Sequence, residues 1–412
     1  MASSSHHSGG HRRHHRSKWS KLKHYLKKPN VVASIAAIVL CIVIVVVVIL
    51  SGSRTPSASG DTASAADGTG ISGGIILQPP DDPVSLVSDA VAVCRKGSNV
   101  NSDVNLDLQP YERDQHRLDQ GAPVTIGFGL SDGVDAVGSP IVAVSKNADF
   151  SDKTEYRLGQ YERSCDIYNL EPGTHYYYAV TCMLQDGSEL CETGEFTTAQ
   201  STRLLKIDGA ENIRDIGGLI TYDGSTVKYG MLYRGSELDG AGDSRYDVSS
   251  EGIGEFLSLT GVKTDMDLRN PADLTFKKDI LGDGVAHRYY SATSYGAIFD
   301  DKATVRKIFA DLADPSSYPV YMHCTYGRDR TGTVCYLLEA LLGVTEEYRS
   351  YDYKLSALIP YNYDYGMIGV VDEGLRLLYE GGSSQQRAEQ FLLSCGVKQT
   401  ELDSIRAILL EG

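Results

Sequence analysis

Apolar and polar positions divide the first part of the chain into regions of different composition. Residues 1–30 are polar and basic, and residues 31–50 form an uncharged run dominated by Val, Ile, Leu and Ala. Twenty such residues are enough to cross the hydrocarbon core of a bilayer as a helix. Residues 51–82 open with a stretch rich in Ser, Gly, Ala and Thr. The pattern predicts a basic tail, a transmembrane helix and a flexible linker.

Residues 83–199 alternate with the period of strands. Residues 122–130, 140–145 and 169–181 carry β-branched and aromatic side chains at alternate positions, with Gly and Pro turns between such stretches. Short alternating strands separated by turns are typical of a β-sandwich of about 100 residues. The region therefore predicts an all-β domain.

Residues 200–412 alternate between strand and helix patterns. Helical spacing is seen at residues 249–260, 303–312, 331–342, 346–358 and 385–395 and in a last helix from Thr400, while residues 262–268 and 318–323 look like buried strands. Strands alternating with helices predict an α/β domain with a mainly parallel sheet flanked by helices. Functional residues in such sheets gather at the carboxyl ends of the strands.

One segment of this domain carries the chemistry. Residues 323–332 read H-C-T-Y-G-R-D-R-T-G, so that Cys324 and Arg330 enclose five residues between a strand and a helix. Strand, tight loop and helix N-terminus together form a phosphate cradle, in which backbone N–H groups point at the anion. The predicted phosphate-binding residues are Thr325, Tyr326, Gly327, Arg328, Asp329 and Arg330.

The side chains of this loop suit phosphoryl transfer through a covalent intermediate. The Cys324 thiolate is the predicted nucleophile, and the planar Arg330 guanidinium can bind two phosphate oxygens. The Thr331 hydroxyl can hydrogen-bond the thiolate and help it to leave, while His323 supports it from behind. No metal-ligand cluster is found in this half, so neither a metal nor another cofactor is expected.

The loop resembles the H-C-x-x-G-K-D-R-T-G motif of atypical bacterial tyrosine/dual-specificity phosphatases, some of which act on phosphoinositides. The similarity continues at residues 212–218, 230–238, 267–269 and 391–410, so it covers residues 201–412. Arg328 replaces the usual Lys, and a second cation beside the cradle would suit a substrate with a second phosphate. Residues 170–180 are similar to a fibronectin type III domain, with Tyr176 at its corner position and Phe128 in place of its core Trp.

A general acid must protonate the leaving group, and two aspartates are candidates. The family resemblance places a functional Asp at Asp329, while Asp267 lies at the end of a neighbouring predicted strand. Either carboxylate could instead pair structurally with Arg214, Arg234 or Arg269. Arg214 and Arg269 are therefore expected to support the site.

Charge is distributed unevenly along the chain. The formal net charge is −15, and residues 1–30 hold eight Lys/Arg and no acid, so the remainder carries −23. An acidic body argues against a nucleic-acid partner. The basic residues before the apolar run, with only Arg54 soon after it, predict a cytoplasmic N-terminus. We therefore expect a single-pass protein of the cell membrane with its catalytic domain outside the cytoplasm.

Cysteine positions agree with an external location. Asp186-Gly187 predicts a two-residue hairpin, which would place Cys182 opposite Cys191 in a pair close enough for a disulfide. Cys94 and Cys165 would then form a second bridge, although four cysteines allow three pairings.

Three functions compete. The first is a membrane-anchored phosphatase acting on phosphotyrosine, phosphoserine/threonine, phosphoinositides or small phosphate esters. The second is a catalytically silent phosphate-binding or adhesion module, and the third is sulfur or arsenate chemistry. The joint presence of Cys324, Asp329 and Arg330 favours the first, and the D-R-T-G continuation argues against the third. The sandwich is a candidate spacer or a binder of a protein or glycan.

Overall fold

The computed structural model describes residues 74–95, 105–111, 117–270, 280–359 and 368–411. The chain divides into two units, residues 1–70 and 71–412, and all described residues belong to the second. The predicted basic tail and transmembrane helix lie outside the described residues. Among the helices that are described, none is long and apolar enough to cross a membrane.

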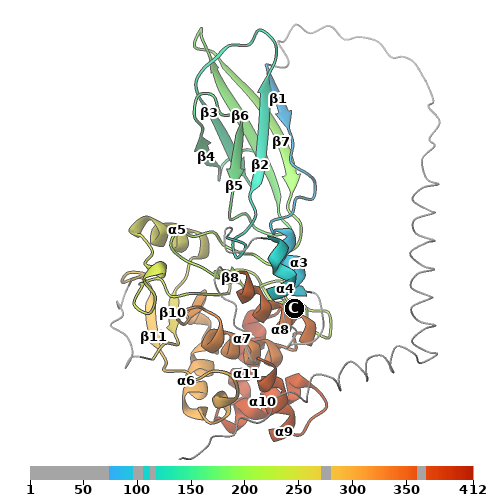
Figure 1. The fold of residues 1–412 in the computed structure, drawn as a ribbon, viewed down its shortest axis with the longest axis vertical. Helices are drawn as coiled ribbons and strands as arrows, with labels where there is room; N and C mark the ends of the chain where they lie inside the picture. The colour runs from blue at the N-terminus through green and yellow to red at the C-terminus, as the bar shows by residue number, and fades with distance from the viewer. Residues whose placement is uncertain (1–73, 96–104, 112–116, 271–279, 360–367, 412) are drawn as a thin grey trace, which may run out of the picture. The chain divides into compact units, whose positions relative to one another are not determined.

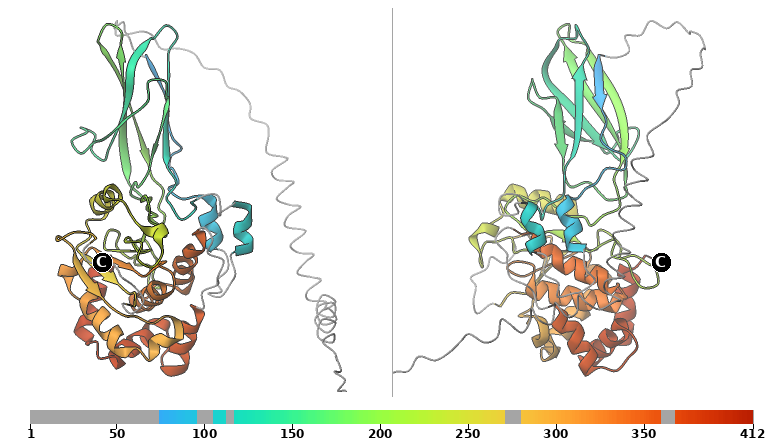
Figure 2. Two further views of the ribbon diagram at one scale, coloured as in Figure 1. Left: turned by 60° about the vertical axis from the view of Figure 1, so that its left-hand side comes forward. Right: turned by 45° about the vertical axis from the view of Figure 1, so that its right-hand side comes forward.

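Seven strands form two antiparallel sheets that share one core (Figures 1 and 2). The first sheet has the order β1-β2-β5 and the second β4-β3-β6-β7. Their bounds are β1 Ile75–Gln78, β2 Val124–Leu130, β3 Ala136–Ser145, β4 Thr154–Arg157, β5 Ser164–Ile167, β6 His175–Leu184 and β7 Glu189–Thr197. The predicted β-sandwich is present, but it begins at Ile75, inside the stretch that the sequence assigned to the linker.

Alternate side chains of these strands fill the sandwich core. In β6, Tyr176, Tyr178 and Val180 are buried and face Phe128 of β2 across the shared core. The Tyr176 hydroxyl accepts a hydrogen bond from the Glu171 N–H at 3.0 Å, which ties the start of β6 to the preceding turn. Tyr176 and Tyr178 therefore have packing roles.

The hairpin between β6 and β7 differs from its prediction by one residue. Its loop has three residues, 185–187, closed by the Leu184 N–H donating to the Ser188 carbonyl, with Gly187 at φ 84°. A one-residue change of register moves every side chain to the other face. Cys182 consequently lies opposite Leu190 and is buried, whereas Cys191 lies opposite Thr181 and is exposed.

The predicted disulfides are therefore wrong for this structure. Cys165, Cys182 and Cys191 are free thiols. Cys94 lies in the buried face of helix α3 (Asp89–Arg95), where its thiol donates to the Lys354 carbonyl at 3.5 Å. The two-residue turn, on which the pairing depended, does not form.

The connection between β1 and β2 leaves the sandwich and packs on the next domain. It contains α3, α4 (Asn105–Leu108) and η1 (Gln109–Tyr111). Helix α3 contacts helix α8 (Glu346–Leu355), and their apolar side chains share a small core. Asp119, after this excursion, accepts a hydrogen bond from the Asn212 N–H at 2.8 Å. This segment of the sandwich region thus packs against the α/β domain.

A five-stranded sheet with the order β11-β10-β12-β9-β8 forms the centre of residues 200–412. All neighbouring pairs are parallel except β8 with β9. The strands are β8 Arg214–Asp215, β9 Leu232–Gly235, β10 Thr264–Asp267, β11 Ala286–Tyr289 and β12 Val320–His323. The predicted mainly parallel sheet is confirmed, and β12, which precedes the phosphate loop, is its middle strand.

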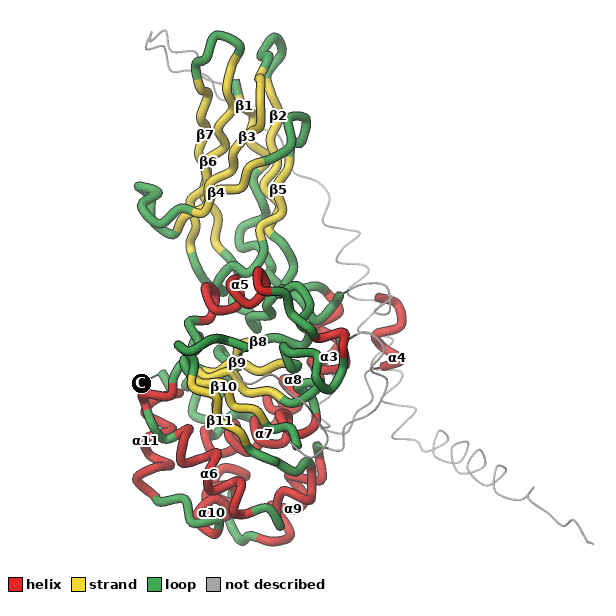
Figure 3. The backbone as a smooth tube through the Cα atoms, turned by 90° about the vertical axis from the view of Figure 1, so that its left-hand side faces the viewer, coloured by secondary structure: helices red, strands yellow, loops and turns green. Residues whose placement is uncertain are grey.

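Helices cover both faces of this sheet (Figure 3). They are η2 Ser244–Tyr246, α5 Ser250–Thr260, η4 Tyr295–Phe299, α6 Lys302–Leu312, η5 Pro315–Ser317, α7 Asp329–Leu342, α8, η6 Ser356–Leu358, α9 Gly369–Leu378, α10 Ser384–Ser394 and α11 Gln399–Leu409. In β12, Val320 and Met322 join the larger core with α7, while Tyr321 packs on Phe256 of α5. Helix α7 is buried on nearly all sides, which explains its run of apolar residues.

Candidate active site

The phosphate loop lies between the middle strand and the most deeply buried helix. Strand β12 ends at His323, Cys324 follows with 3% of its surface exposed, and α7 begins at Asp329. Gly327 has φ 68°, and a Cβ on it would lie 2.2 Å from the carbonyl oxygen of Gly235. Only glycine can therefore make this turn against the end of β9.

Three consecutive carbonyl groups of the loop are bound from the outside. The Glu237 N–H donates to the Thr325 carbonyl at 3.0 Å, and the Asn212 amide donates to the Tyr326 carbonyl at 3.0 Å. The Arg234 guanidinium donates to the Gly327 carbonyl at 2.8 Å. These donors come from the segments around β8 and β9, which fix the outer side of the loop.

This outward fixation turns the loop amides inward. In a planar trans peptide the N–H of one residue points opposite to the preceding carbonyl. The N–H groups of Tyr326, Gly327 and Arg328 consequently point away from the three outer donors, toward the concave side of the loop. The first N–H groups of α7 add positive potential at the same place. The geometry is that of an oxyanion cradle.

Arg330 differs from the buried arginines around it. Its guanidinium reaches the Leu268 carbonyl at 3.5 Å, and within the described residues no carboxylate forms an ion pair with it. The Thr331 side chain is fully buried, and its hydroxyl has no hydrogen-bond partner among the described residues. The predicted hydrogen bond between Thr331 and the Cys324 thiol is therefore not formed in this structure. The hydroxyl makes no hydrogen bond to any other described residue either.

His323 is held as an imidazolium beneath the loop. Its Nε2 lies 3.0 Å from Asp265 Oδ1, and its Nδ1 lies 3.3 Å from the Cys324 carbonyl oxygen. Burial lowers the pKa of His323, but the charges of Asp265 and Asp267 outweigh burial and raise it to about 9. In the protonated ring Nδ1 can donate to the Cys324 carbonyl while Nε2 faces the Asp265 carboxylate, so His323 is placed to hold the backbone of Cys324.

Asp267 is a structural carboxylate and not a free acid. It is fully buried and binds the Arg269 guanidinium through both oxygens, the shorter contact being 2.6 Å. Burial raises the pKa of Asp267, but His323, His287 and Arg269 together hold it far below its usual range. The geometry therefore gives Asp267 a structural role and leaves Asp329 as the candidate general acid.

Arg214 lies behind the loop in a second buried ion cluster. Asp352 of α8 binds Arg214 at 2.7 Å through one oxygen and Arg234 through the other. Because Arg234 also holds the Gly327 carbonyl, Asp352 fixes the loop indirectly. Arg214 and Arg269 thus lie in two separate ion clusters next to the loop.

Asp329 lies in the first turn of α7 with 39% of its side chain exposed. The Tyr295 hydroxyl donates to its Oδ1, and the Arg328 Nε lies 3.4 Å from the same oxygen. The other oxygen, Oδ2, has no partner among the described residues. Asp329 is therefore the loop carboxyl with one oxygen available to a leaving group.

The sequence predicted that the Arg328 side chain would lie beside the cradle as a second cation. In the structure the side chain is buried instead. It is 6% exposed, and its Nε lies 3.4 Å from Asp329 Oδ1. Burial lowers the pKa of the Arg328 guanidinium, but Asp329 and the neighbouring Tyr353 outweigh burial and raise it. Burial under α8 and the nearby acceptors hold the guanidinium in this position. Arg328 therefore contributes its backbone N–H to the cradle, while its charge is engaged by protein groups.

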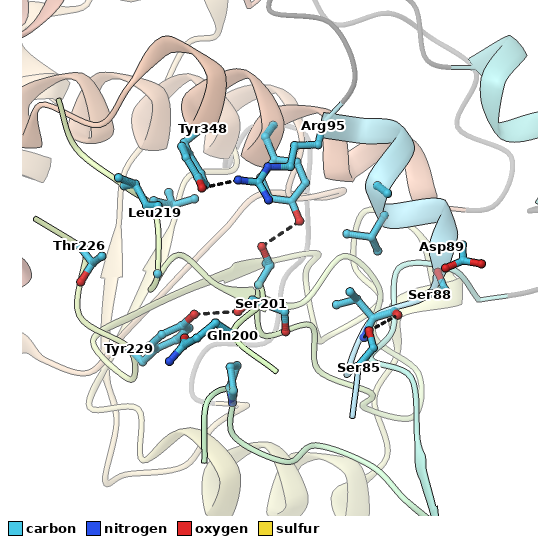
Figure 4. Close-up of a pocket in the computed structure, with 18 of the residues that line it drawn as sticks. Ser85, Ser88, Asp89, Arg95, Gln200, Ser201, Leu219, Thr226, Tyr229 and Tyr348 are labelled. Atoms are coloured by element: carbon cyan, nitrogen blue, oxygen red, sulfur yellow. Dashed lines mark hydrogen bonds between the residues drawn. The ribbon is translucent and has the colours of Figure 1, made fainter. Parts of the chain in front are cut away.

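A cavity of about 610 Å³ lies away from this loop, between α3, α8 and the segment around Ser201 (Figure 4). Among the lining residues, Arg95 donates to the Tyr348 hydroxyl and Tyr229 donates to the Ser201 carbonyl. None of the loop residues 323–332 lines it. The cavity belongs to the junction with the excursion from the sandwich and not to the cradle.

Sequence reasoning found the loop but missed several residues that shape it. Tyr295 and Asp352 were not assigned roles, and Asn212 and Glu237 were recognised only within longer motifs. Their contacts with the loop or its partners span 34 to 138 positions in the sequence. The described residues contain no cluster of His, Cys, Asp or Glu able to hold a metal ion.

Comparison with known proteins agrees with this geometry. A sequence profile described as the tyrosine phosphatase family matches residues 205–411, which include the entire cradle and its supporting strands. A search of curated proteins finds no match to the chain. Because the profile covers half of the 412 residues, the chain belongs to the tyrosine phosphatase family.

Proposed function

We propose that this phosphatase hydrolyses phosphate monoesters through a cysteinyl-phosphate intermediate on Cys324. The observation that carries the proposal is the outward fixation of the carbonyls of Thr325, Tyr326 and Gly327, which turns the following amides toward one point. Preorganised amide donors at that point would stabilise the transferring phosphoryl oxygens. Arg330, which has no carboxylate partner among the described residues, supplies the cation.

Each step follows from one named group. The Cys324 thiolate attacks phosphorus, the bond to the leaving oxygen breaks, and Asp329 delivers its proton to that oxygen through Oδ2. Asp329, now ionised, takes a proton from a water molecule that attacks the phosphorus of the intermediate. The S–P bond then breaks and inorganic phosphate forms. Cys324 leaves as a thiolate, to which the Thr331 hydroxyl can donate a hydrogen bond.

Substrates with one phosphate suit the cradle better than those with two. The sequence-based expectation of a second phosphate site depended on a free cation at Arg328, and that guanidinium is engaged by Asp329 and Tyr353. Phosphotyrosine and phosphoserine/threonine, which carry one phosphate, are therefore our preferred substrates, with phosphoinositides that carry a second phosphate as the comparison.

The membrane location and the sandwich family also remain proposals. The apolar run at residues 31–50 and the basic residues before it support a single-pass anchor with an external catalytic domain. The three-plus-four strand arrangement and the Tyr176 corner hydrogen bond support a fibronectin type III-like sandwich. Protease treatment of intact cells should remove the catalytic domain, and its full protection would contradict this orientation.

The catalytic proposal is tested with the full chain in detergent micelles under reducing conditions. Phosphate release is measured from a phosphotyrosine peptide and, in parallel, from a phosphoinositide bisphosphate. Cys324→Ser should abolish release from both, whereas Cys395→Ser, at a half-buried thiol beyond α10, should retain it. Phosphate binding without any hydrolysis by the folded wild type would contradict the proposal and favour the silent binding module.

A further inference from the structure

The hydroxyl of Tyr295 lies at the centre of a chain of hydrogen bonds that ends on Asp329. Tyr295 donates to Asp329 Oδ1, and its oxygen also lies 2.9 Å from the Tyr353 hydroxyl. A phenol has a single proton to donate. Since that proton goes to Asp329, Tyr353 must donate to Tyr295, and the chain is directed from Tyr353 through Tyr295 to the carboxyl group.

This direction determines which oxygen of Asp329 serves the reaction. In this arrangement Oδ1 accepts the Tyr295 proton and is not the oxygen that presents a proton to a leaving group. The proton needed by a leaving group must therefore reside on Oδ2, which has no partner among the described residues. The same donor stabilises the carboxylate that remains after proton transfer.

The backbone of Tyr295 is a second and independent observation. Its φ of 56° lies in the left-handed region, which a bulky residue other than glycine rarely adopts. Its N–H donates to Thr333 Oγ1 at 2.8 Å, and Thr333 donates in turn to the Asp329 carbonyl at 2.8 Å. Tyr295 is thus attached to the first turn of α7 through both its backbone and its side chain.

Tyr295 comes from a distant element, the start of η4, and not from the phosphate loop. A strained backbone that persists at such a place is held by its surroundings and is a reason to look for function. We propose that Tyr295 is a positioning residue that orients Asp329 for proton transfer, with Tyr353 as its supporting donor. This inference rests on the proposed function, since it assigns the environment of the proposed general acid.

The test compares two aryl phosphates whose leaving groups differ in basicity. A general acid matters more for phenyl phosphate than for p-nitrophenyl phosphate, because nitrophenolate leaves without a proton. Tyr295→Phe in the full chain should lower kcat/KM about tenfold for phenyl phosphate, which is the loss of one hydrogen bond to a charged group. For p-nitrophenyl phosphate the loss should stay below about threefold.

Two further readouts separate positioning from a structural effect. In an Asp329→Asn background, Tyr295→Phe should cause no additional loss, because both changes act on the same step. Tyr353→Phe, which keeps the direct donor, should give a smaller loss of the same kind.

Tyr351→Phe is the matched control, because it removes a buried hydroxyl of α8 that accepts from Thr202 instead. It should leave the ratio of the two substrates unchanged. Equal losses on both substrates, or losses additive with Asp329→Asn, would overturn the inference. Hydrolysis that still disappears in Cys324→Ser would then leave the proposed function intact, whereas activity that survives this change would overturn both.

Discussion

Gly327→Ala is the most direct test of the cradle geometry. Gly327 has φ 68°, and an added Cβ would lie 2.2 Å from the Gly235 carbonyl oxygen. An ordinary contact begins near 3.4 Å, so the loop must move by about 1.2 Å, the difference between these distances. The obstacle is backbone at the end of β9 and cannot rotate away as a side chain would.

Gly327→Ala should affect both the stability of the loop conformation and the rate of catalysis. The left-handed conformation itself costs alanine about 1–2 kcal/mol relative to glycine. The displacement acts on the amides that should bind phosphoryl oxygens, and a shift of about 1 Å in such a site can lower a rate about a hundredfold. We therefore expect kcat/KM to fall by about a hundredfold or more, beyond what modest destabilisation can explain.

Gly343→Ala provides a matched control at the other end of α7. Gly343 also has a left-handed φ, 78°, but its Cβ would meet only the flexible Gln385 side chain, at 3.0 Å. The left-handed φ should lower the free energy of unfolding in urea by a similar amount in both variants. Only Gly327→Ala should lose hydrolysis of p-nitrophenyl phosphate. Full activity in Gly327→Ala, or an equal loss in Gly343→Ala, would refute the assignment of the loop amides to catalysis.

Three other predictions follow from buried charge and register. Asp352→Asn should lower the free energy of unfolding by about 3–5 kcal/mol in urea, because it removes the charge shared by two buried arginines; the exposed Asp403→Asn change should cost under about 0.5 kcal/mol. The pKa of His323, about 9, is above its ordinary value. The protonated ring should therefore contribute its full share to the free energy of unfolding below about pH 6.5, and this contribution should be lost as pH rises through 9. Asp265→Asn should make the free energy of unfolding fall less over this pH range. A thiol reagent should label Cys191 first among the sandwich thiols of the folded chain, and a Cys182–Cys191 disulfide in mass mapping would contradict the register.

Local patterns predicted those parts of the fold that local forces determine. The predicted helix at residues 249–260 matches α5 because Ser249 caps it and Gly261 ends it. The segment from β12 through Cys324 to α7 was likewise predicted, because strand, glycine turn and helix are all contiguous. The phosphate loop is such a contiguous element, and its amide geometry could be anticipated from its sequence.

Features that depend on distant partners could not be predicted in the same way. The hairpin loop has three residues instead of two, and this single difference separated Cys182 from Cys191. The sequence also offered Asp267 as a possible acid, because its three partners His323, His287 and Arg269 meet only in the folded sheet. The engagement of Arg328 by Tyr353 likewise requires α8 to pack over the loop.

The arrangement of charges explains how an acidic protein can present a phosphate site. Arg214 and Arg234 share Asp352, and Arg269 is surrounded by carboxylates, so these cations serve to fix geometry. Buried ion pairs of this kind contribute little net stability, but breaking one is costly, so each holds its partners in place. In the described part of the loop, Arg330 alone has no carboxylate ion pair. Attraction for phosphate is thus confined to the cradle, where it acts at short range and requires a fitting anion.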